Sequence, residues 1–116
     1  MTDKHINTEL PLSEAVFLIL LSLADGPKHG YAIMKDVHSL SDERVSLSTG
    51  TLYGALKRLL KQAWVTRVNG ETIIENGRER KEYALTKTGV RILGAEAARM
   101  QTLANAARLR TAENRT

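Results

Sequence analysis

The sequence predicts a mainly helical fold that carries one β-hairpin and ends in a long helix. Apolar residues recur at helical spacing through residues 11–63 and again through residues 87–110. Between these stretches, residues 65–85 are rich in β-branched side chains and contain Asn76-Gly77, a dipeptide typical of a two-residue hairpin turn. The pattern therefore indicates a helical unit with a hairpin, followed by a separate terminal helix.

Composition narrows the class of protein further. The 116 residues suffice for one domain with a modest core, and the 42% hydrophobic and 26% charged residues are typical of a globular chain. No apolar run reaches the roughly 18–20 residues that span a bilayer. The chain has no cysteine, which excludes disulfides and cysteine-bound zinc and predicts a cytoplasmic protein. A net charge of +4 favours a polyanionic partner.

No recognisable set of catalytic or metal-binding residues predicts an enzyme. The three histidines, His5, His29 and His38, lack the spacing of metal ligands, so we expect no metal and no cofactor. His29 is better explained as a residue at a helix start than as a ligand. No serine, histidine and carboxylate set and no carboxylate pair stands in a recognisable catalytic context.

Residues 1–10 are polar and predict a flexible N-terminal arm. The first helix is expected over residues 11–24, with Ser13 as its cap and Asp25-Gly26-Pro27 as its stop. Apolar residues surround this helix, and Phe17, Leu18 and Leu21 have no polar side to face. A helix that is apolar all round is buried all round, which predicts a second subunit. The alternative is that the C-terminal helix of the same chain folds back over it.

A second helix is expected over residues 29–40, with Ile33, Val37 and Leu40 facing inward. A polar loop follows it, and residues 45–47 could form a short edge strand. A third helix then runs over residues 48–63, so the two helices and their connection predict a helix-turn-helix.

The third helix has two unlike faces. Ser48 is a good N-cap, because its hydroxyl can accept from a backbone N–H in the first turn. At 100° per residue, the core face holds Leu52, Leu56, Leu59 and Ala63. The opposite face holds Gly50, Gly54, Lys57, Arg58 and Lys61. A basic face with room for close backbone approach suits the major groove of DNA, and Lys57 and Arg58 are the candidates for base contacts. The alternative is a solvated surface helix.

The predicted hairpin has a basic tip. Arg78, Arg80 and Lys81 follow the Asn76-Gly77 turn, where they could lie along phosphates or in a minor groove. A hairpin of this kind after a helix-turn-helix is the wing of a winged helix. Asn69-Gly70 is a competing turn or bulge. Interspersed glutamates leave open the alternative of a solvated charged turn.

The last helix is expected over residues 87–110, capped by Thr86, with residues 111–116 frayed. Its small and apolar residues form one seam that must find a partner helix. The seam holds Val90, Leu93, Ala97, Met100, Ala104 and Ala107. The opposite face holds Arg91, Glu96, Arg99 and Gln101.

Several motifs in this order resemble the PadR family of bacterial repressors. They are His29-Gly30-Tyr31, Ser46-Leu47-Ser48, Gly50-Thr51-Leu52-Tyr53, Ala55-Leu56, Arg58-Leu59, Arg80-Lys81-Glu82-Tyr83, Leu85-Thr86 and Gly89. The resemblance covers about residues 12–93 and points to the smaller subfamily with a single terminal helix. It implies a winged helix-turn-helix homodimer that binds a palindromic operator and is often released by a small aromatic or cationic compound.

The resemblance also assigns residues. It implies that Ser48, Thr51, Tyr53 and Tyr31 contact the DNA backbone and that Arg78 and Lys81 belong to a basic wing. Thr49 and Gly54 depart from the family pattern, which puts the operator sequence in doubt. The terminal helix lacks the tryptophan that lines a drug pocket in some small members, since Trp64 lies elsewhere; Phe17 and Met100 could line a different pocket.

The sequence thus predicts two sets of site residues and two functions. The DNA-binding set is Tyr31, Ser48, Thr49, Gly50, Thr51, Tyr53, Lys57, Arg58, Lys61, Arg78, Arg80 and Lys81. The dimer-interface set is Phe17, Leu18, Leu21, Val90, Leu93, Ala97, Met100 and Ala104. The leading hypothesis is a homodimeric DNA-binding regulator in which residues 11–86 bind DNA and residues 87–110 dimerise. The alternative is a winged helix that binds another protein and has lost specific DNA binding.

Overall fold

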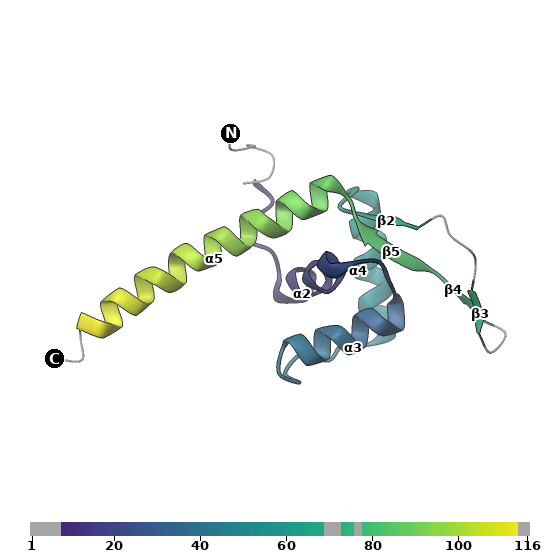
Figure 1. The fold of residues 1–116 in the computed structure, drawn as a ribbon, viewed down its shortest axis with the longest axis horizontal. Coiled ribbons are helices and arrows are strands. Elements are labelled where there is room, and N and C mark those ends of the chain that lie inside the picture. Colours follow the sequence, from purple (N-terminus) through teal and green to yellow (C-terminus); the bar gives the residue numbers. More distant parts are fainter. Residues whose placement is uncertain (1–7, 69–72, 76–77, 114–116) are drawn as a thin grey trace.

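The computed structural model describes residues 8–68, 73–75 and 78–113 of the chain. Most of the predicted flexible arm and the last residues of the predicted frayed tail lie outside this part. The elements, with the labels of Figure 1, are α2 (Glu14–Ser22), a short 3₁₀ helix η1 (Leu23–Asp25), β1 (Lys28–His29), α3 (Gly30–Leu40), α4 (Thr49–Lys61), β2 (Val65–Arg67), β3 (Ile73–Glu75), β4 (Arg78–Arg80), β5 (Glu82–Leu85) and α5 (Lys87–Glu113).

Side-chain caps start the helices, as the sequence predicts. Each cap oxygen or nitrogen accepts from a backbone N–H that the first helical turn cannot satisfy. The cap bonds are Ser13 Oγ with Val16 N (3.1 Å), His29 Nδ1 with Ala32 N (3.3 Å), Ser48 Oγ with Thr51 N (3.1 Å) and Thr86 Oγ1 with Gly89 N (3.0 Å). His29 therefore has the structural role that the sequence favours for it.

One core lies between the three N-terminal helices, the sheet and the first turns of α5. Its residues from α2 to α4 are Leu18, Ile19, Leu20, Leu23, Ile33, Val37, Leu47, Leu52, Ala55, Leu56 and Leu59, and Trp64, Val65, Tyr83 and Ile92 complete it. Two inward predictions are wrong at helix ends. Leu40 is exposed in the last turn of α3, and Ala63 is exposed after α4, where φ is +62° and the helical spacing no longer applies.

The strands form two small antiparallel sheets. In the first, β5 lies between β1 and β2, and in the second, β3 pairs with β4. The sequence analysis missed β1, which has only two residues, and its expected strand at residues 45–47 is absent, because these residues have no strand pairing. The strand that completes the sheet is therefore the one before α3 and not the one before α4.

The hairpin changes register along its length. Near the body, Val65 pairs with Leu85 and the Val68 N–H donates to the Glu82 carbonyl at 3.0 Å. Toward the tip, Ile73 pairs with Arg80, so four residues of the chain separate the two paired segments on one side of the hairpin and one residue, Lys81, separates them on the other.

The strands at the far end of the hairpin pair in the way that the predicted turn requires. Glu75 pairs with Arg78, which leaves two residues for the connection. The Asn76-Gly77 dipeptide that the sequence predicts for this turn lies outside the described residues. The competing Asn69-Gly70 lies outside the described residues.

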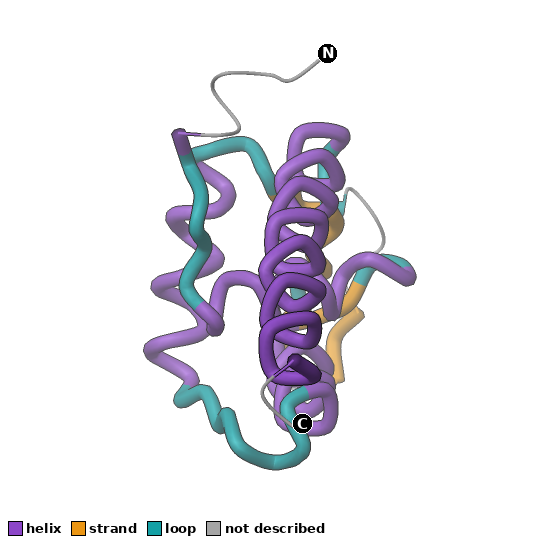
Figure 2. Tube along the Cα trace, turned by 90° about the vertical axis from the view of Figure 1, so that its left-hand side faces the viewer, coloured by secondary structure: helices purple, strands orange, loops and turns teal. Residues whose placement is uncertain are grey.

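The helix α5 packs on the body for its first turns and then projects from it (Figure 1). Seen from its free end, it lies in front of the other helices (Figure 2). It continues to Glu113, so the prediction that fraying starts at Thr111 is wrong; the Thr111 hydroxyl donates to the Ala107 carbonyl at 2.9 Å. The wing and the free end of α5 point away from opposite sides of the body.

The face of α5 that meets the body differs from the predicted one. Ile92 and Glu96 are each 1% exposed, whereas Val90 in the predicted seam is 57% exposed. The expectation that Glu96 lies on the solvent face is therefore wrong. A charged residue is assigned to solvent by default, and the sequence gives no sign of the partners that Glu96 finds.

The apolar helix α2 is covered in part by its own chain. The helix α5 packs against it, which is the alternative that the sequence left open. Leu18 is buried in the core of the same chain, while Phe17 and Leu21 are half-buried. Within the described residues, no helix is long and apolar enough to cross a membrane.

Candidate nucleic-acid interface

The outward face of α4 is basic and carries few bulky side chains. Lys57, Arg58 and Lys61 are exposed, while Leu52, Leu56 and Leu59 on the opposite side are buried, as the helical spacing predicts. A side chain added at Gly50 or at Gly54 would meet nothing within 4 Å. Packing within the chain therefore gives no reason for glycine at either position, and a flat partner could come close to the backbone here.

The first turn of α4 presents a cluster of small polar groups. Ser48, Thr49, Gly50 and Thr51 are all exposed. The Ser48 hydroxyl accepts from the Thr51 N–H and donates to Thr51 Oγ1 at 2.8 Å. Both hydroxyls are thus oriented at the positive end of the helix, where an anion is stabilised.

Tyr53 packs across the start of α3. Its hydroxyl would lie 2.4 Å from a Cβ at Gly30, so the ring occupies the space that a side chain on Gly30 would take. The Tyr53 side chain remains 45% exposed. Glycine at this position therefore lets Tyr53 lie against α3 with its edge still open to solvent.

A second tyrosine hydroxyl lies close to this position on the sheet. Tyr83 of β5 is buried, and burial raises the pKa of its hydroxyl; the nearby Tyr53 adds to this rise, while Arg67 opposes it. The Tyr83 phenol is therefore neutral at physiological pH and can donate a hydrogen bond.

Tyr31 stands exposed on α3, next to Gly30. The Lys35 ammonium lies over its ring, 5.5 Å from the ring centre, in a cation–π contact. The sequence analysis missed Lys35, although its i, i+4 spacing from Tyr31 on a helix could have indicated it. The start of α3 thus carries an aromatic ring and a cation on one exposed face.

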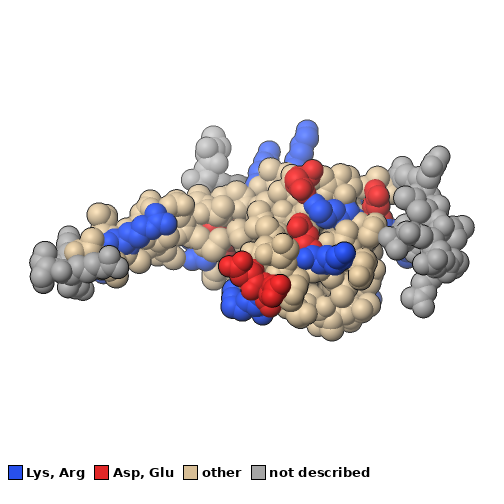
Figure 3. Space-filling model, turned by 60° about the horizontal axis from the view of Figure 1, so that its bottom comes forward, with Lys and Arg blue, Asp and Glu red and all other residues tan. Residues whose placement is uncertain are grey.

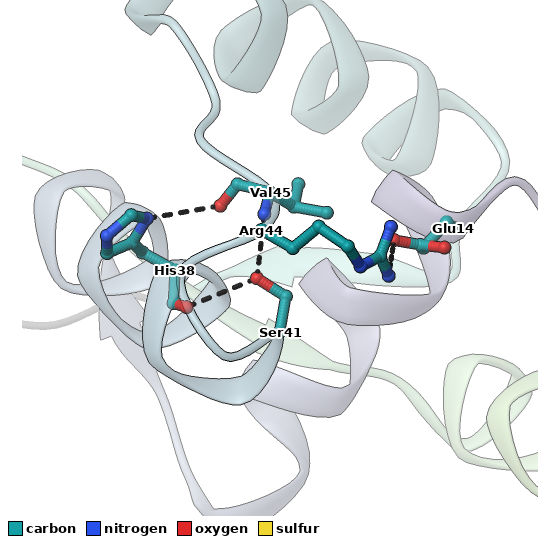
Figure 4. Close-up of polar contacts among 5 residues, drawn as sticks. All are labelled: Glu14, His38, Ser41, Arg44 and Val45. Carbon is teal, nitrogen blue, oxygen red and sulfur yellow. Dashed lines mark hydrogen bonds and ion pairs between the residues drawn. The ribbon is translucent and has the colours of Figure 1, made fainter.

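Polar contacts fix the turn between α3 and α4 (Figure 4). Ser41 Oγ donates to the His38 carbonyl at 3.1 Å and accepts from the Val45 N–H at 2.9 Å. Arg44 forms an ion pair with Glu14 in the first turn of α2. The turn is therefore bonded to the end of α3 and, through an exposed ion pair, to α2.

Arg58 lies at the edge of the basic face, beside a cavity. The cavity has a volume of about 200 Å³ and is open to solvent. Its lining includes Arg58 and Gln62 from the end of α4, Trp64, and Val16 from α2. One side of Arg58 thus adjoins a cavity with both polar and apolar lining residues, unlike Lys57 and Lys61, which do not line it.

The wing carries its cations in and after β4. Arg78 and Arg80 begin and end this strand, and their side chains lie outside the description, as does the rest of the tip. Lys81, between β4 and β5, is exposed. Arg67 at the end of β2 is a further exposed cation that the sequence analysis did not select.

Charged side chains of both signs are scattered over the body on the face shown in Figure 3, and basic side chains stand out along the projecting part of α5. Arg108 and Arg110 are exposed there. In the part of the chain that the structure describes, no group of three or more histidine, aspartate or glutamate residues could hold a metal ion. The geometry is that of a binding surface made of backbone, hydroxyl and cationic groups.

The sequence profile of the Transcriptional regulator PadR-like family matches residues 19–95, which is more than half of the chain. The chain belongs to the PadR-like family. This confirms the family that the motifs suggested, and with it a transcriptional regulator rather than an enzyme. The matched residues run from α2 through the wing to the turns of α5 that pack on the body.

Solved PadR-family structures share the fold. A PadR family regulator from Eggerthella lenta is 28% identical with a TM-score of 0.62, over 90% of this chain and 82% of that one. A PadR family regulator from Clostridium difficile is 24% identical with a TM-score of 0.69, over 84% and 97% of the two chains. Bacillus subtilis PadR, solved in complex with operator DNA, is 27% identical with a TM-score of 0.62, over 73% and 47%. The winged helix-turn-helix with a long terminal helix is thereby confirmed.

One curated relative is closer in sequence. An uncharacterized 37.1 kDa protein in transposon TN4556 of Streptomyces fradiae is 41% identical over 91 residues. The match spans 78% of this chain and 24% of the relative, so this chain corresponds to about a quarter of that protein's length.

Proposed function

We propose that this PadR-like regulator is a homodimeric repressor that binds a palindromic operator, with α4 of each subunit in a major groove. The observation that carries the proposal is the outward face of α4, where Lys57 and Lys61 follow two glycines, Gly50 and Gly54, with open space above them. A basic surface without bulk allows the backbone to approach DNA closely. The operator complex of Bacillus subtilis PadR supports the same class of ligand here.

The exposed groups divide by their chemistry. Ser48, Thr51, Tyr53 and Tyr31 present hydroxyls and rings at the starts of α3 and α4, and we assign them to phosphates. Thr49 and Gly50 lie between them on the first turn of α4. Lys57 and Arg58 are assigned to base edges, because lysine and arginine are common readers of guanine. Lys61 and the wing cations Arg78, Arg80 and Lys81 are assigned to the flanking backbone.

The dimer is proposed on the exposed apolar face of α5. Val90 and Leu103 are each 57% exposed, and Met100 and Ala97 are exposed beside them. Leu93, Ala104, Phe17 and Leu21 are partly exposed. An apolar helix face of this length in water favours a second copy of the chain. Leu18 is buried in its own subunit, so we do not place it in direct contact with the partner subunit.

The direct test is a mobility shift on an inverted repeat flanking the gene, at several salt concentrations, with random DNA beside it. Lys57→Ala and Arg58→Ala are expected to weaken binding to the repeat more than binding to random DNA. Lys61→Ala is expected to weaken both equally and to lower the salt slope by about one unit. Arg91→Ala, exposed on α5 away from this face, is the control and should leave both unchanged.

Equal losses on both DNAs for Lys57→Ala and Arg58→Ala would contradict base readout. No binding to any duplex at low salt would contradict the proposal and leave the protein-binding winged helix. Release by a small molecule is a further part of the proposal, and the cavity beside Arg58 is the candidate site for it, since a ligand there would contact α4 directly.

A further inference from the structure

The buried carboxylate of Glu96 joins α5 to the start of α2. Its Oε2 accepts from the Leu12 N–H at 2.6 Å, and its Oε1 accepts from the Arg99 side chain. Leu12 comes just before Ser13, the cap of α2, so the negative charge lies near the positive end of that helix. A fully buried carboxylate persists only where such partners compensate its desolvation.

A second attachment holds the base of α5. Thr86 caps this helix and donates from its hydroxyl to the Ala63 carbonyl at 2.6 Å, directly after α4. Three residues later, a Cβ on Gly89 would lie 2.0 Å from the Trp64 carbonyl oxygen, so the helix backbone lies directly on the chain that follows α4. Gly89 and Glu96 are seven residues apart, or about 10 Å along the helix.

These two attachments lie at different points along α5 and together determine the direction of the helix. From Ala97 to Ala112, every residue of α5 except Arg99 and Ala104 is exposed, so this part of the helix receives little support from its own chain. From Glu96 to Glu113 the helix extends about 25 Å, and a rotation of roughly 10° at its base would move its end by about 4 Å.

We propose that Glu96 is a positioning residue that fixes the direction of α5 relative to the DNA-binding unit and thereby sets the spacing between the two α4 helices of the dimer. This inference rests on the proposed dimeric, DNA-binding function. Half-sites of a helix-turn-helix dimer lie about 34 Å apart, so a shift of a few ångströms in each subunit changes which half-site spacing fits.

The first experiment needs neither DNA nor knowledge of the operator. The chain has no cysteine, so spin labels at Ser39→Cys on α3 and Arg108→Cys on α5 report one distance within a subunit, once labelled chains are diluted with unlabelled ones. Parent protein is expected to give a narrow distribution and E96A a broader or shifted one. E96Q keeps an oxygen that can accept from the Leu12 N–H, so its distribution should stay close to that of the parent.

An E96A distribution of unchanged width and position would overturn the inference. Should E96A fail to fold, as circular dichroism would show, R99A takes its place. It removes one of the two partners of the carboxylate and is expected to broaden the distribution less; no broadening would overturn the inference equally.

The second experiment measures spacing on DNA. Inverted repeats that differ by one or two base pairs between half-sites are bound by parent, E96A and E96Q. Parent and E96Q are expected to prefer one spacing about tenfold or more over its neighbours, and E96A to lose that preference while binding random DNA as the parent does. A preference retained in E96A would overturn the inference. Failure of the parent to bind any repeat would instead reject the proposed function, and the spin-label result would still stand alone.

Discussion

Gly30 is a residue whose missing side chain positions another residue. A Cβ there would overlap the end of the Tyr53 side chain, which is partly exposed and free to swing outward. Gly30→Ala should therefore displace the Tyr53 hydroxyl while changing the free energy of unfolding by less than about 1 kcal/mol, since alanine also favours the helix. DNA affinity is expected to fall on operator and random DNA alike, as measured by fluorescence anisotropy.

Tyr53→Phe and Gly89→Ala are the comparisons for this prediction. Tyr53→Phe removes the hydroxyl without moving the ring and should reproduce much of the affinity loss. At Gly89 the obstacle is the Trp64 backbone carbonyl, which cannot swing away, so Gly89→Ala should destabilise by about 1–3 kcal/mol in urea denaturation. Equal stability costs for Gly30→Ala and Gly89→Ala would contradict this reading of the two glycines.

Gly54 poses the opposite case, because nothing in the chain fills the space above it. Gly54→Ala is expected to stabilise the fold by about 0.5–1 kcal/mol, as alanine does in a helix interior, and to weaken DNA binding by keeping the backbone from the groove. Gly94→Ala on α5 is the matched control, since its added Cβ also meets open space. It should give a similar gain in stability with DNA affinity unchanged; an unaffected affinity in Gly54→Ala would remove the argument for close approach.

At the scale of elements, the junction of α2 and α5 should respond to acid. The guanidinium of Arg99, as the largest cause, and the Leu12 N–H hold the pKa of Glu96 below its ordinary value of 4.5, while burial opposes them. Because the folded pKa lies below the unfolded one, the stabilisation is complete above the unfolded pKa and is lost as pH falls through the folded one. Unfolding free energies of parent and E96Q, measured in urea between pH 7 and pH 3, should therefore converge toward acid pH. Parallel curves would contradict this.

The helices and the pairing of the hairpin strands could be predicted because their signals are local. Ser13, Ser48 and Thr86 each cap a helix by accepting from the backbone N–H three residues further on, and Glu75 pairs with Arg78, as a two-residue turn between them requires. Features that depend on distant partners could not be predicted in this way. The carboxylate of Glu96 accepts from the Leu12 N–H, which is 84 residues away in the sequence, and no local pattern marks that contact.

The candidate interface shows the same division. The basic face of α4 follows from helical spacing alone, and the structure exposes the residues that this spacing selects. The contact between Gly30 and Tyr53 joins two helices and needed the fold. The two-residue strand β1 is too short to carry a periodic signal, so the sequence offers residues 45–47 as an edge strand instead.

For the whole molecule, the exposed face of α5 predicts that assembly and DNA affinity are lost together. Met100→Asp places a charge in that face and is expected to give a particle of single-subunit mass by light scattering. Affinity for an inverted repeat should fall by about 10²-fold or more, because two linked half-sites then bind independently. Ala98→Asp adds the same charge on an exposed part of α5 outside the seam and is the control. A Met100→Asp protein that remains a dimer would place the contact elsewhere.

The packing of Ile92 in the core has a consequence for anyone who divides this protein. Ile92 is almost fully buried in the core that α5 shares with the rest of the chain, and Glu96 accepts a hydrogen bond from Leu12, just before α2. A fragment that ends between the wing and α5 would therefore expose the apolar core residues that Ile92 covers. It would also lose the bond that holds the segment before α2. The smallest autonomous piece must include three turns of the terminal helix, so hybrid regulators should be joined beyond Glu96 and not at Thr86.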